Sequence, residues 1–325
     1  MNIQTTAPAR LRISHAGGDG ALIRFAFGPA LTTIAGAADN PLALPCTYLA
    51  GPGTSENWWS GPISESAQTC GAAWAHGDQY AMAALSVNEE DSDIQRAAHI
   101  AYERLITCVR PSAHPYLLRI WNYFSAINEG AGDLERYRRF CVGRARGVDG
   151  SFNDPPPAAT AIGASSATGR LQVIALCARE PATALENPRQ TPAWRYPREF
   201  GPVSPGFSRG AILDAGSDHP RLLASGTASI VGHVSRHIGD VGAQLRESLA
   251  NLEALLAEGS ASGRHDFTLS GCEALRIYLR QPADLDSARL VIVGSGLPED
   301  RVVYLHGDIC RRELSVEIEG VFVAA

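Results

Sequence analysis

The feature that most constrains the fold is a succession of helices and strands that occurs twice along the 325 residues. Three pairs of segments correspond: the predicted helices at 91–109 and 240–257, YLLRIWNYFSAI at 116–127 and EALRIYLRQPAD at 273–284, and LQVIALCA at 171–178 and LSVEIEGV at 314–321. Because a repeated unit of this size points to duplication, we expect two diverged copies of one fold. The mixture of helices and strands in each copy predicts the α+β class.

The length of the chain agrees with two domains of ordinary size. A segment rich in Pro and Arg at 181–205 separates the copies, so we predict domains at 1–180 and 181–325, the second of which carries the site. Further elements are predicted as helices at 134–145 and 284–293 and strands at 79–87, 116–127, 222–231 and 271–279. Residues 10–28 read as two short strands around a Gly-rich turn, and 29–76 as a long irregular region with one or two strands.

Composition excludes several classes of function. All 28 basic residues are arginine, so a lysine Schiff base and a Walker A phosphate loop are both impossible here. The net charge of −6, without a dense basic run, predicts no nucleic-acid partner. No window resembles a signal peptide or a membrane span, and the seven scattered cysteines fit free thiols, so we expect a soluble cytoplasmic protein with no membrane contact.

The segment from Tyr304 to Gly320, YLHGDICRRELSVEIEG, has the densest set of reactive side chains and reads as the last two strands of a sheet. From Leu314 onward apolar and polar residues alternate, which predicts that Glu317 and Glu319 share one strand face. Such a strand could simply present carboxylates to water. In the first copy, however, Ile174 occupies the position of Glu317, so the fold itself does not require a carboxylate there.

Four segments then carry a resemblance to a known family: YPREFGPVSPGFSR at 196–209, SGTASIVGH at 225–233, LHGDICR at 305–311 and VEIEG at 316–320. Together they resemble the chorismatases, two-domain enzymes that are similar to the Rid (YjgF) proteins. The resemblance implies two Rid-like, or chorismate mutase-like, units with mixed sheets and helices packed on one face. It implies release of pyruvate from chorismate, no cofactor and no metal, and a monomer or a homotrimer. The first 75 residues match no motif.

The resemblance also implies residue roles. Glu317, in the VEIEG strand, corresponds to the family's catalytic glutamate, and Cys310 to a cysteine found in members that form 3-hydroxybenzoate. Chorismate carries two carboxylates, and arginine forks are the strongest clamps for such groups. The candidates for substrate binding are Tyr196, Arg198, Arg209 (with Arg195 as a substitute), Gly226 and Asp308. Glu319 or Asp308 could keep Glu317 protonated by charge repulsion.

Alternatives stay open at this point. The product could be 3-hydroxybenzoate, 4-hydroxybenzoate, a mixture, or the dihydroxycyclohexadiene carboxylate. A Rid-like imine deaminase or binding protein is a second class of function. A third is a metal hydrolase, whose ligands would be His233, His237, Asp240, His306 and Asp308, although the SGTAS segment before the histidines favours a strand or loop over the helix that their spacing would need.

Overall fold

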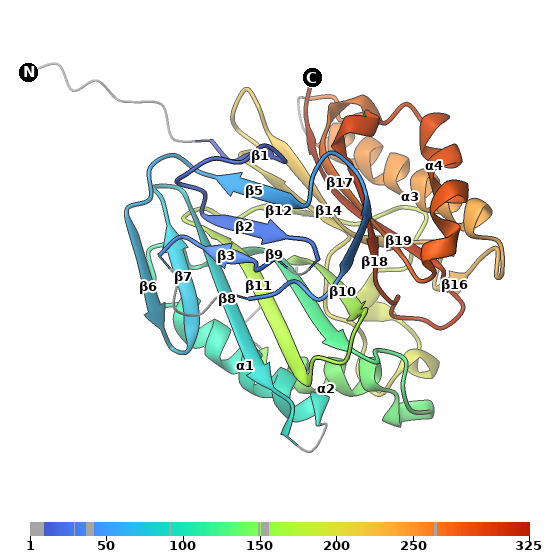
Figure 1. Cartoon of the computed structure of the whole chain (residues 1–325), viewed down its shortest axis with the longest axis horizontal. Coiled ribbons are helices and arrows are strands. Elements are labelled where there is room, and N and C mark those ends of the chain that lie inside the picture. The colour runs from blue at the N-terminus through green and yellow to red at the C-terminus, as the bar shows by residue number, and fades with distance from the viewer. Residues whose placement is uncertain are drawn as a thin grey trace, which may run out of the picture.

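The computed structural model describes residues 10–28, 30–36, 42–90, 93–148, 150, 156–262 and 265–325. Within these ranges the strands form three large sheets and one two-stranded ribbon, β15 (Ile230–Val231) with β16 (Val234–Ser235). The three sheets surround a common centre, and the helices lie outside them (Figure 1). The predicted α+β class is confirmed.

The first repeat is a six-stranded sheet with the order β10-β9-β11-β8-β7-β6. Its strands are β6 (Glu65–Thr69), β7 (Ala72–His76), β8 (Tyr80–Asn88), β9 (Tyr116–Ser125), β10 (Ala158–Ala164) and β11 (Arg170–Ala178). β10 runs parallel to β9 and the other pairs are antiparallel, so the sheet is mixed. Helices α1 (Ile94–Val109) and α2 (Arg136–Val148) bury one face of it in an apolar core.

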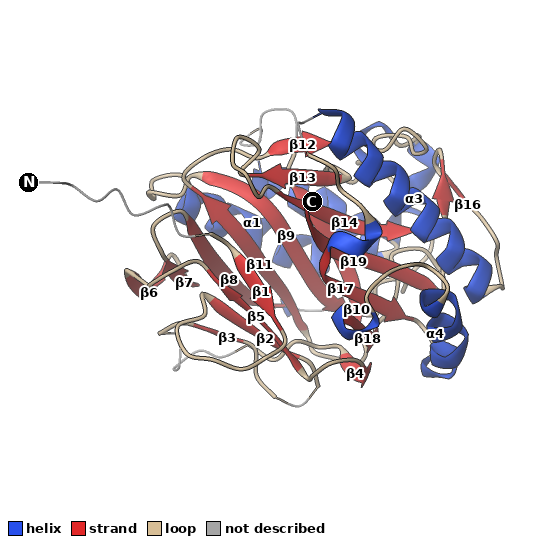
Figure 2. Cartoon of the chain, turned by 90° about the horizontal axis from the view of Figure 1, so that it is seen from above, coloured by secondary structure: helices blue, strands red, loops and turns tan. Residues whose placement is uncertain are grey.

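The second repeat has the same arrangement, with the strand order β12-β13-β14-β19-β17-β18-β4, in which β4 (Thr47–Ala50) is added at the edge by the N-terminal segment. Its strands are β12 (Thr183–Leu185), β13 (Gly210–Leu213), β14 (Arg221–Ala228), β17 (Cys272–Leu279), β18 (Val302–His306) and β19 (Val316–Val323). Helices α3 (Val241–Ser262) and α4 (Leu285–Val293) line the outer face (Figure 2). β18 is parallel to β17, as β10 is to β9.

The register of the strands confirms the duplication in detail. In the first repeat Ile174 of β11 lies opposite Trp121 of β9, and in the second repeat Glu317 of β19 lies opposite Tyr278 of β17. These are the partners that the sequence correspondence requires, since Trp121 and Tyr278 occupy the same place in their segments. The exchange of Ile174 for Glu317 is therefore a substitution at one equivalent position of the two sheets.

The N-terminal segment differs from the prediction, because residues 12–59 are not part of the first repeat. β1 (Arg12–Ser14), β2 (Ile23–Ala26), β3 (Thr33–Ile34) and β5 (Ser55–Trp59) form a separate sheet with the order β1-β5-β2-β3. The strands on either side of the Gly-rich turn exist, but each pairs with β5 and not with the other. β4 (Thr47–Ala50) joins the second repeat by pairing with the edge strand β18.

Aromatic packing joins the N-terminal sheet to the sheet of the first repeat. Phe25 from β2, Trp58 from β5 and Trp121 from β9 contact one another edge to face, with ring centroids 5.3–6.3 Å apart. Buried aromatic pairs of this geometry add to the stabilisation from burial alone. The N-terminal sheet is thus a structural third part of the molecule.

The helices agree with prediction to within a few residues. The N-terminal end of α1 is capped by Asp93, whose Oδ1 accepts hydrogen bonds from the backbone N–H groups of Gln95 and Arg96 at 3.0 and 3.1 Å. The helix was predicted from 91, and residues 91 and 92 lie outside the described ranges. Strand β10 and some of the strands within 29–76 were not predicted from the sequence. No helix among the described residues has the length and hydropathy needed to cross a membrane.

Candidate active site

A cavity of about 480 Å³ lies between the two repeats. Edge strand β10 and helix α2 of the first repeat form one side, and β14 and β19 of the second repeat form the other. The loop before β13 and the loop before β19 complete the lining. Its main side chains are Tyr137, Cys141, Arg144, Thr160, Tyr196, Phe200, Phe207, Arg209, Cys310, Arg311 and Glu317.

Backbone contacts between the repeats fix this interface. The N–H of Gly163 in β10 donates to the carbonyl of Asp308 at 2.7 Å, and the N–H of Asp308 donates back at 2.8 Å. At the other end of β10, Ala158 forms a bridge with Ser208. A strand of one repeat is therefore joined at both ends to loops of the other, which gives the cavity a firm boundary.

Glu317 lies on the face of β19 that is turned toward the cavity. The alternation predicted from the sequence is confirmed, because Val316 and Ile318 pack in the core beneath the helices while Glu317 lines the cavity. Its carboxyl group lies directly over Gly226 of β14, where a Cβ atom would be only 2.1 Å from Oε1. Gly226 sits in a register shift between Ala224 and Thr227, so a residue without a side chain makes room for the acid.

Glu317 is held as a protonated acid. Burial, and to a smaller extent the negative charge of Glu319, raise its pKa to about 8, against the smaller opposing effects of Arg119 and Arg209. The side chain is only 5% exposed, so water does little to stabilise the anion. A carboxylic acid with this pKa can donate a proton at neutral pH.

Three arginines of the lining retain unused hydrogen-bond donors. The Nε atoms of Arg144 and Arg209 and the Nη2 atom of Arg311 are buried and have no partner among the described residues. The remaining guanidinium atoms hold the side chains in place: Arg209 donates to the Tyr196 hydroxyl at 2.8 Å, and Arg311 donates to the carbonyl of His233 at 2.8 Å. Buried donors without partners are costly, so three of them on one cavity indicate a site for anionic groups.

Aromatic rings position the same arginines. The guanidinium of Arg311 lies 4.2 Å from the ring centroid of Phe200, and that of Arg209 lies 5.2 Å from the centroid of Phe207. Arg144 donates to the carbonyl of Gly206 in the same loop. The loop between β12 and β13 therefore supplies the apolar walls that hold cations from both repeats.

Cys310 also lines the cavity, in the loop between β18 and β19. Burial raises the pKa of its thiol, and the charge of Glu317 raises it further, so the sulfur is a neutral thiol and not a thiolate nucleophile. Tyr137 of α2 lines the cavity as well, and burial raises its pKa well above the ordinary value. Both groups can act only as neutral, weakly polar neighbours of whatever the cavity holds.

The structure brings Glu317, Cys310, Tyr196, Arg209 and Gly226 together around one cavity, so these five remain the candidates for the site. Two other candidates lie elsewhere, and these predictions need correction. Arg198 is exposed and forms a bidentate pair with Asp133, with distances of 3.0 and 2.6 Å. Asp308 forms an ion pair with Arg280 and bridges to β10, and it is not part of the cavity lining.

The substitute candidate, Arg195, is also exposed and is not part of the lining. The histidines of the metal alternative are separated: His237 pairs with Glu247 at 3.0 Å, while His233 packs against Phe200. In the part of the chain that the structure describes, no three His, Cys, Asp or Glu side chains are grouped as metal ligands.

Tyr137, Arg144 and Arg311 line the cavity but were not among the residues predicted from the sequence. Arg144, in the helix predicted at 134–145, is 6% exposed and lines the cavity. A usable signal was present, because residues 137, 141 and 144 have the spacing i, i+4, i+7 that puts side chains on one helix face. Arg311 follows Cys310 directly and could have been considered with it.

The fold and the cavity define a class of protein: a duplicated α+β chain with a protonated glutamic acid facing an arginine-lined cavity between its repeats. Residues 56–177 match the family model described as "Chorismatase FkbO/Hyg5-like, N-terminal". A chorismatase of Streptomyces rapamycinicus is 38% identical over 275 residues, covering 82% of this chain and 81% of that protein. A 3-hydroxybenzoate synthase of Streptomyces hygroscopicus is 33% identical over 277 residues, covering 82% and 81%.

A solved structure agrees. The crystal structure of a chorismatase at 1.08 Å resolution superposes with a TM-score of 0.85 and 30% sequence identity, covering 98% of this chain and 100% of that one. The chain belongs to the chorismatase family.

Proposed function

We propose that this protein cleaves chorismate, releasing pyruvate and a hydroxybenzoate, with Glu317 as the general acid. The observation that carries the proposal is the pairing of an acid protonated at neutral pH with unused arginine donors on one cavity. Kinship with chorismatases that are 30–38% identical supports the choice of substrate.

Arg144, Arg209 and Arg311 are the proposed clamps for the two carboxylates. They come from α2, from the residue before β13 and from the loop before β19, so their donors enter the cavity from separate directions. A cavity of about 480 Å³ suits a ligand of chorismate's size, since small-molecule sites span roughly 300–1,000 Å³. Two charges of the ligand would be matched by fixed cations in a site that excludes most water.

In the proposed mechanism the proton of Glu317 is transferred to the methylene carbon of the enol ether. The enol ether side chain of chorismate then carries an oxocarbenium centre, and Glu317 becomes a carboxylate beside it. Capture of that centre by water gives a hemiketal that breaks down to pyruvate and the dihydrodiol acid. Alternatively, the neighbouring ring hydroxyl captures the oxocarbenium centre. One bond between a ring carbon and an ether oxygen then breaks and a ring proton is lost. The products are pyruvate and a hydroxybenzoate, and no water is consumed overall.

The 3-hydroxybenzoate outcome is the finer part of the proposal and depends on Cys310. Its neutral thiol lines the cavity close enough to Glu317 for the glutamate to raise the pKa of the thiol. A weakly polar sulfur at this place would hold water away from the oxocarbenium centre, so that the internal hydroxyl captures it first. One relative, at 33% identity, is named a 3-hydroxybenzoate synthase.

The test is to incubate the purified chain with chorismate, to measure pyruvate with lactate dehydrogenase and NADH, and to separate the aromatic acids by chromatography. We expect pyruvate and a hydroxybenzoate in equal amounts, with 3-hydroxybenzoate as the main acid. Absence of pyruvate would refute the activity. The dihydrodiol acid or 4-hydroxybenzoate as the main product would refute only the role given to Cys310.

A further inference from the structure

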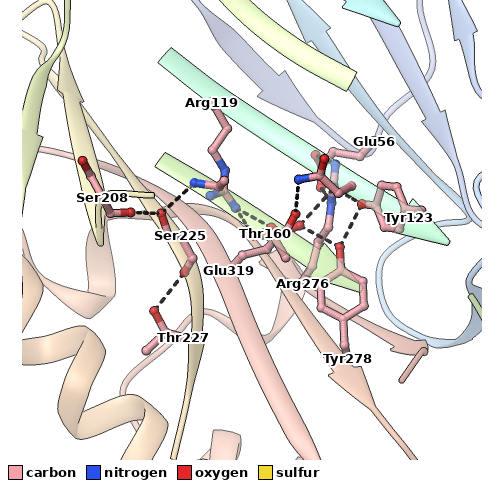
Figure 3. Close-up of polar contacts among 12 residues, drawn as sticks. Glu56, Arg119, Tyr123, Thr160, Ser208, Ser225, Thr227, Arg276, Tyr278 and Glu319 are labelled. Atoms are coloured by element: carbon pink, nitrogen blue, oxygen red, sulfur yellow. Dashed lines mark hydrogen bonds and ion pairs between the residues drawn. The ribbon is translucent and has the colours of Figure 1, made fainter. Parts of the chain in front are cut away.

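Glu56, Arg119, Arg276 and Glu319 form a cluster of buried charges (Figure 3). Glu319 lies two residues from Glu317 on β19. Glu319 accepts hydrogen bonds from the Tyr278 hydroxyl at 2.7 Å, from the Thr160 hydroxyl at 2.5 Å and from Nη1 of Arg276 at 3.1 Å. It also forms an ion pair with Arg119. With donors on both oxygens, Glu319 is fixed as a carboxylate two residues from the candidate acid.

Arg276 is shared between two carboxylates. Besides Glu319 it contacts Glu56, with Nη2 to Oε1 at 2.5 Å and Nε to Oε2 at 3.2 Å. The contact to Glu56 is bidentate, whereas the contact to Glu319 is a single bond. Glu56 also accepts from the indole N–H of Trp58 at 2.6 Å. Arg276 therefore makes the stronger interaction with Glu56 and the weaker one with Glu319.

The cluster is assembled from all three sheets. Glu56 lies on β5 of the N-terminal sheet, Arg119 on β9 of the first repeat, and Arg276 and Glu319 on β17 and β19 of the second. Each of these side chains is 3% exposed or less. Two buried cations balance two buried anions, so this cluster has no surplus positive charge to stabilise an ionised Glu317.

We propose that Glu56 is a positioning residue for Glu317, acting through Arg276 and Glu319. By engaging Arg276 with both oxygens, it leaves Glu319 as a repulsive neighbour that keeps Glu317 in its acid form. The N-terminal sheet, which contributes no residue to the cavity lining, would then set the protonation of the group that faces the cavity.

Apart from Glu319, the charged and titratable groups described around Glu317 do not favour its acid form. Arg119 of β9 and Arg209 before β13 favour its anion, and Cys310 and Tyr137 are neutral neighbours from the loop before β19 and from α2. If Glu56 lost its charge, Arg276 would be free to neutralise Glu319, and the repulsion that favours the acid form would weaken. The expected direction is a lower pKa of Glu317.

The test rests on the proposed chorismate cleavage and uses the pH dependence of kcat/KM, which reports essential groups of the free enzyme. Glu56→Gln should move the alkaline limb to lower pH by about one unit, which means about a tenfold loss above that limb and little loss near pH 6. Glu56→Asp, which keeps the charge, should leave the limb in place. Arg276→Gln, which removes the cation instead, should move the limb to higher pH.

Glu273→Gln is the matched control. Glu273 also links sheets, because it accepts from Arg221 at 2.8 Å and from the N–H of Ile13 in the N-terminal sheet at 3.2 Å, but it does not contact Glu319. It should lower stability without moving the limb. An unmoved limb in Glu56→Gln, or the same direction of shift in Glu56→Gln and Arg276→Gln, would overturn the proposal. If Glu56→Gln does not fold, an alkaline limb of Arg276→Gln that is unmoved or moved to lower pH overturns the proposal. Absence of pyruvate from the unaltered protein refutes the proposed function instead.

Discussion

Replacement of Glu317 by glutamine should abolish most activity while making the protein more stable at alkaline pH. Glutamine has the same shape but no proton to donate, so turnover should fall by about 10² to 10⁴, or roughly 3 to 5 kcal/mol of barrier. The acid is available only because of its surroundings: with a pKa of about 8 it is about nine-tenths protonated at pH 7. At its ordinary pKa the fraction would be well under about 1%.

The stability effect follows from the sign of the same shift. A group whose pKa is raised in the folded state holds a proton there that the unfolded chain has already released. Stability from this group is therefore complete below about pH 4.5 and is lost as the pH rises to about 8. The loss is about 1.4 kcal/mol per pH unit over that window, an upper estimate because local rearrangement would soften it.

The measurement is urea unfolding of the unaltered protein and of Glu317→Gln at pH 6, 7, 8 and 9, beside steady-state pyruvate release. The difference in the free energy of unfolding between the two proteins should shift in favour of the variant by more than about 2 kcal/mol from pH 6 to 8. Because the comparison is between two proteins at each pH, other titrating groups cancel. A constant difference over this range, or activity within a few-fold of the unaltered protein, would refute the reasoning.

Three further changes test the cavity. Cys310→Ala should raise the share of dihydrodiol acid among the products with turnover within about tenfold, and an unchanged product ratio would exclude its steering role. Arg209→Gln should raise KM by about 10- to 100-fold through loss of a charged hydrogen bond, whereas exposed Arg198→Gln should leave kinetics unaltered. Gly226→Ala should lower kcat by displacing Glu317 from its place, since the new Cβ would meet its Oε1 at 2.1 Å. Gly216→Ala, which meets nothing within 4 Å, is the control for that change, and equal kinetics in both would contradict the close fit.

The sequence predicted the duplication and the strand that carries the acid, because alternation and repeat spacing are local properties of the chain. It could not rank Glu317 above Glu319 by pattern, since both lie on one strand face. What separates them is the set of partners: Glu319 is bound by Arg276 and Tyr278 of its own sheet and by Arg119 of the first repeat, 200 residues away. Such contacts exist only after the sheets have assembled.

The arginines illustrate the same limit. The loop at 196–209 has two, and composition treats them alike, although Arg198 points to solvent and Arg209 is buried at the cavity. The direction of each side chain is decided by the short turns of that loop and by the aromatic rings against which it packs. Arg144 lies on an arginine-rich helix, a composition typical of a solvent-exposed face, and it is buried because the second repeat packs against that helix.

The pairing of β4 with β18 has a consequence for how the chain reaches its folded state. Ala50 lies opposite Tyr304, so β4, which is synthesised early, can pair only after β18 has been synthesised. Glu56 likewise can form its ion pair only after Arg276, 220 residues later, has been synthesised. Contacts so distant along the chain slow folding, because the loop must close before they contribute. We therefore expect residues 10–28 and 42–60 to gain protection from hydrogen exchange last.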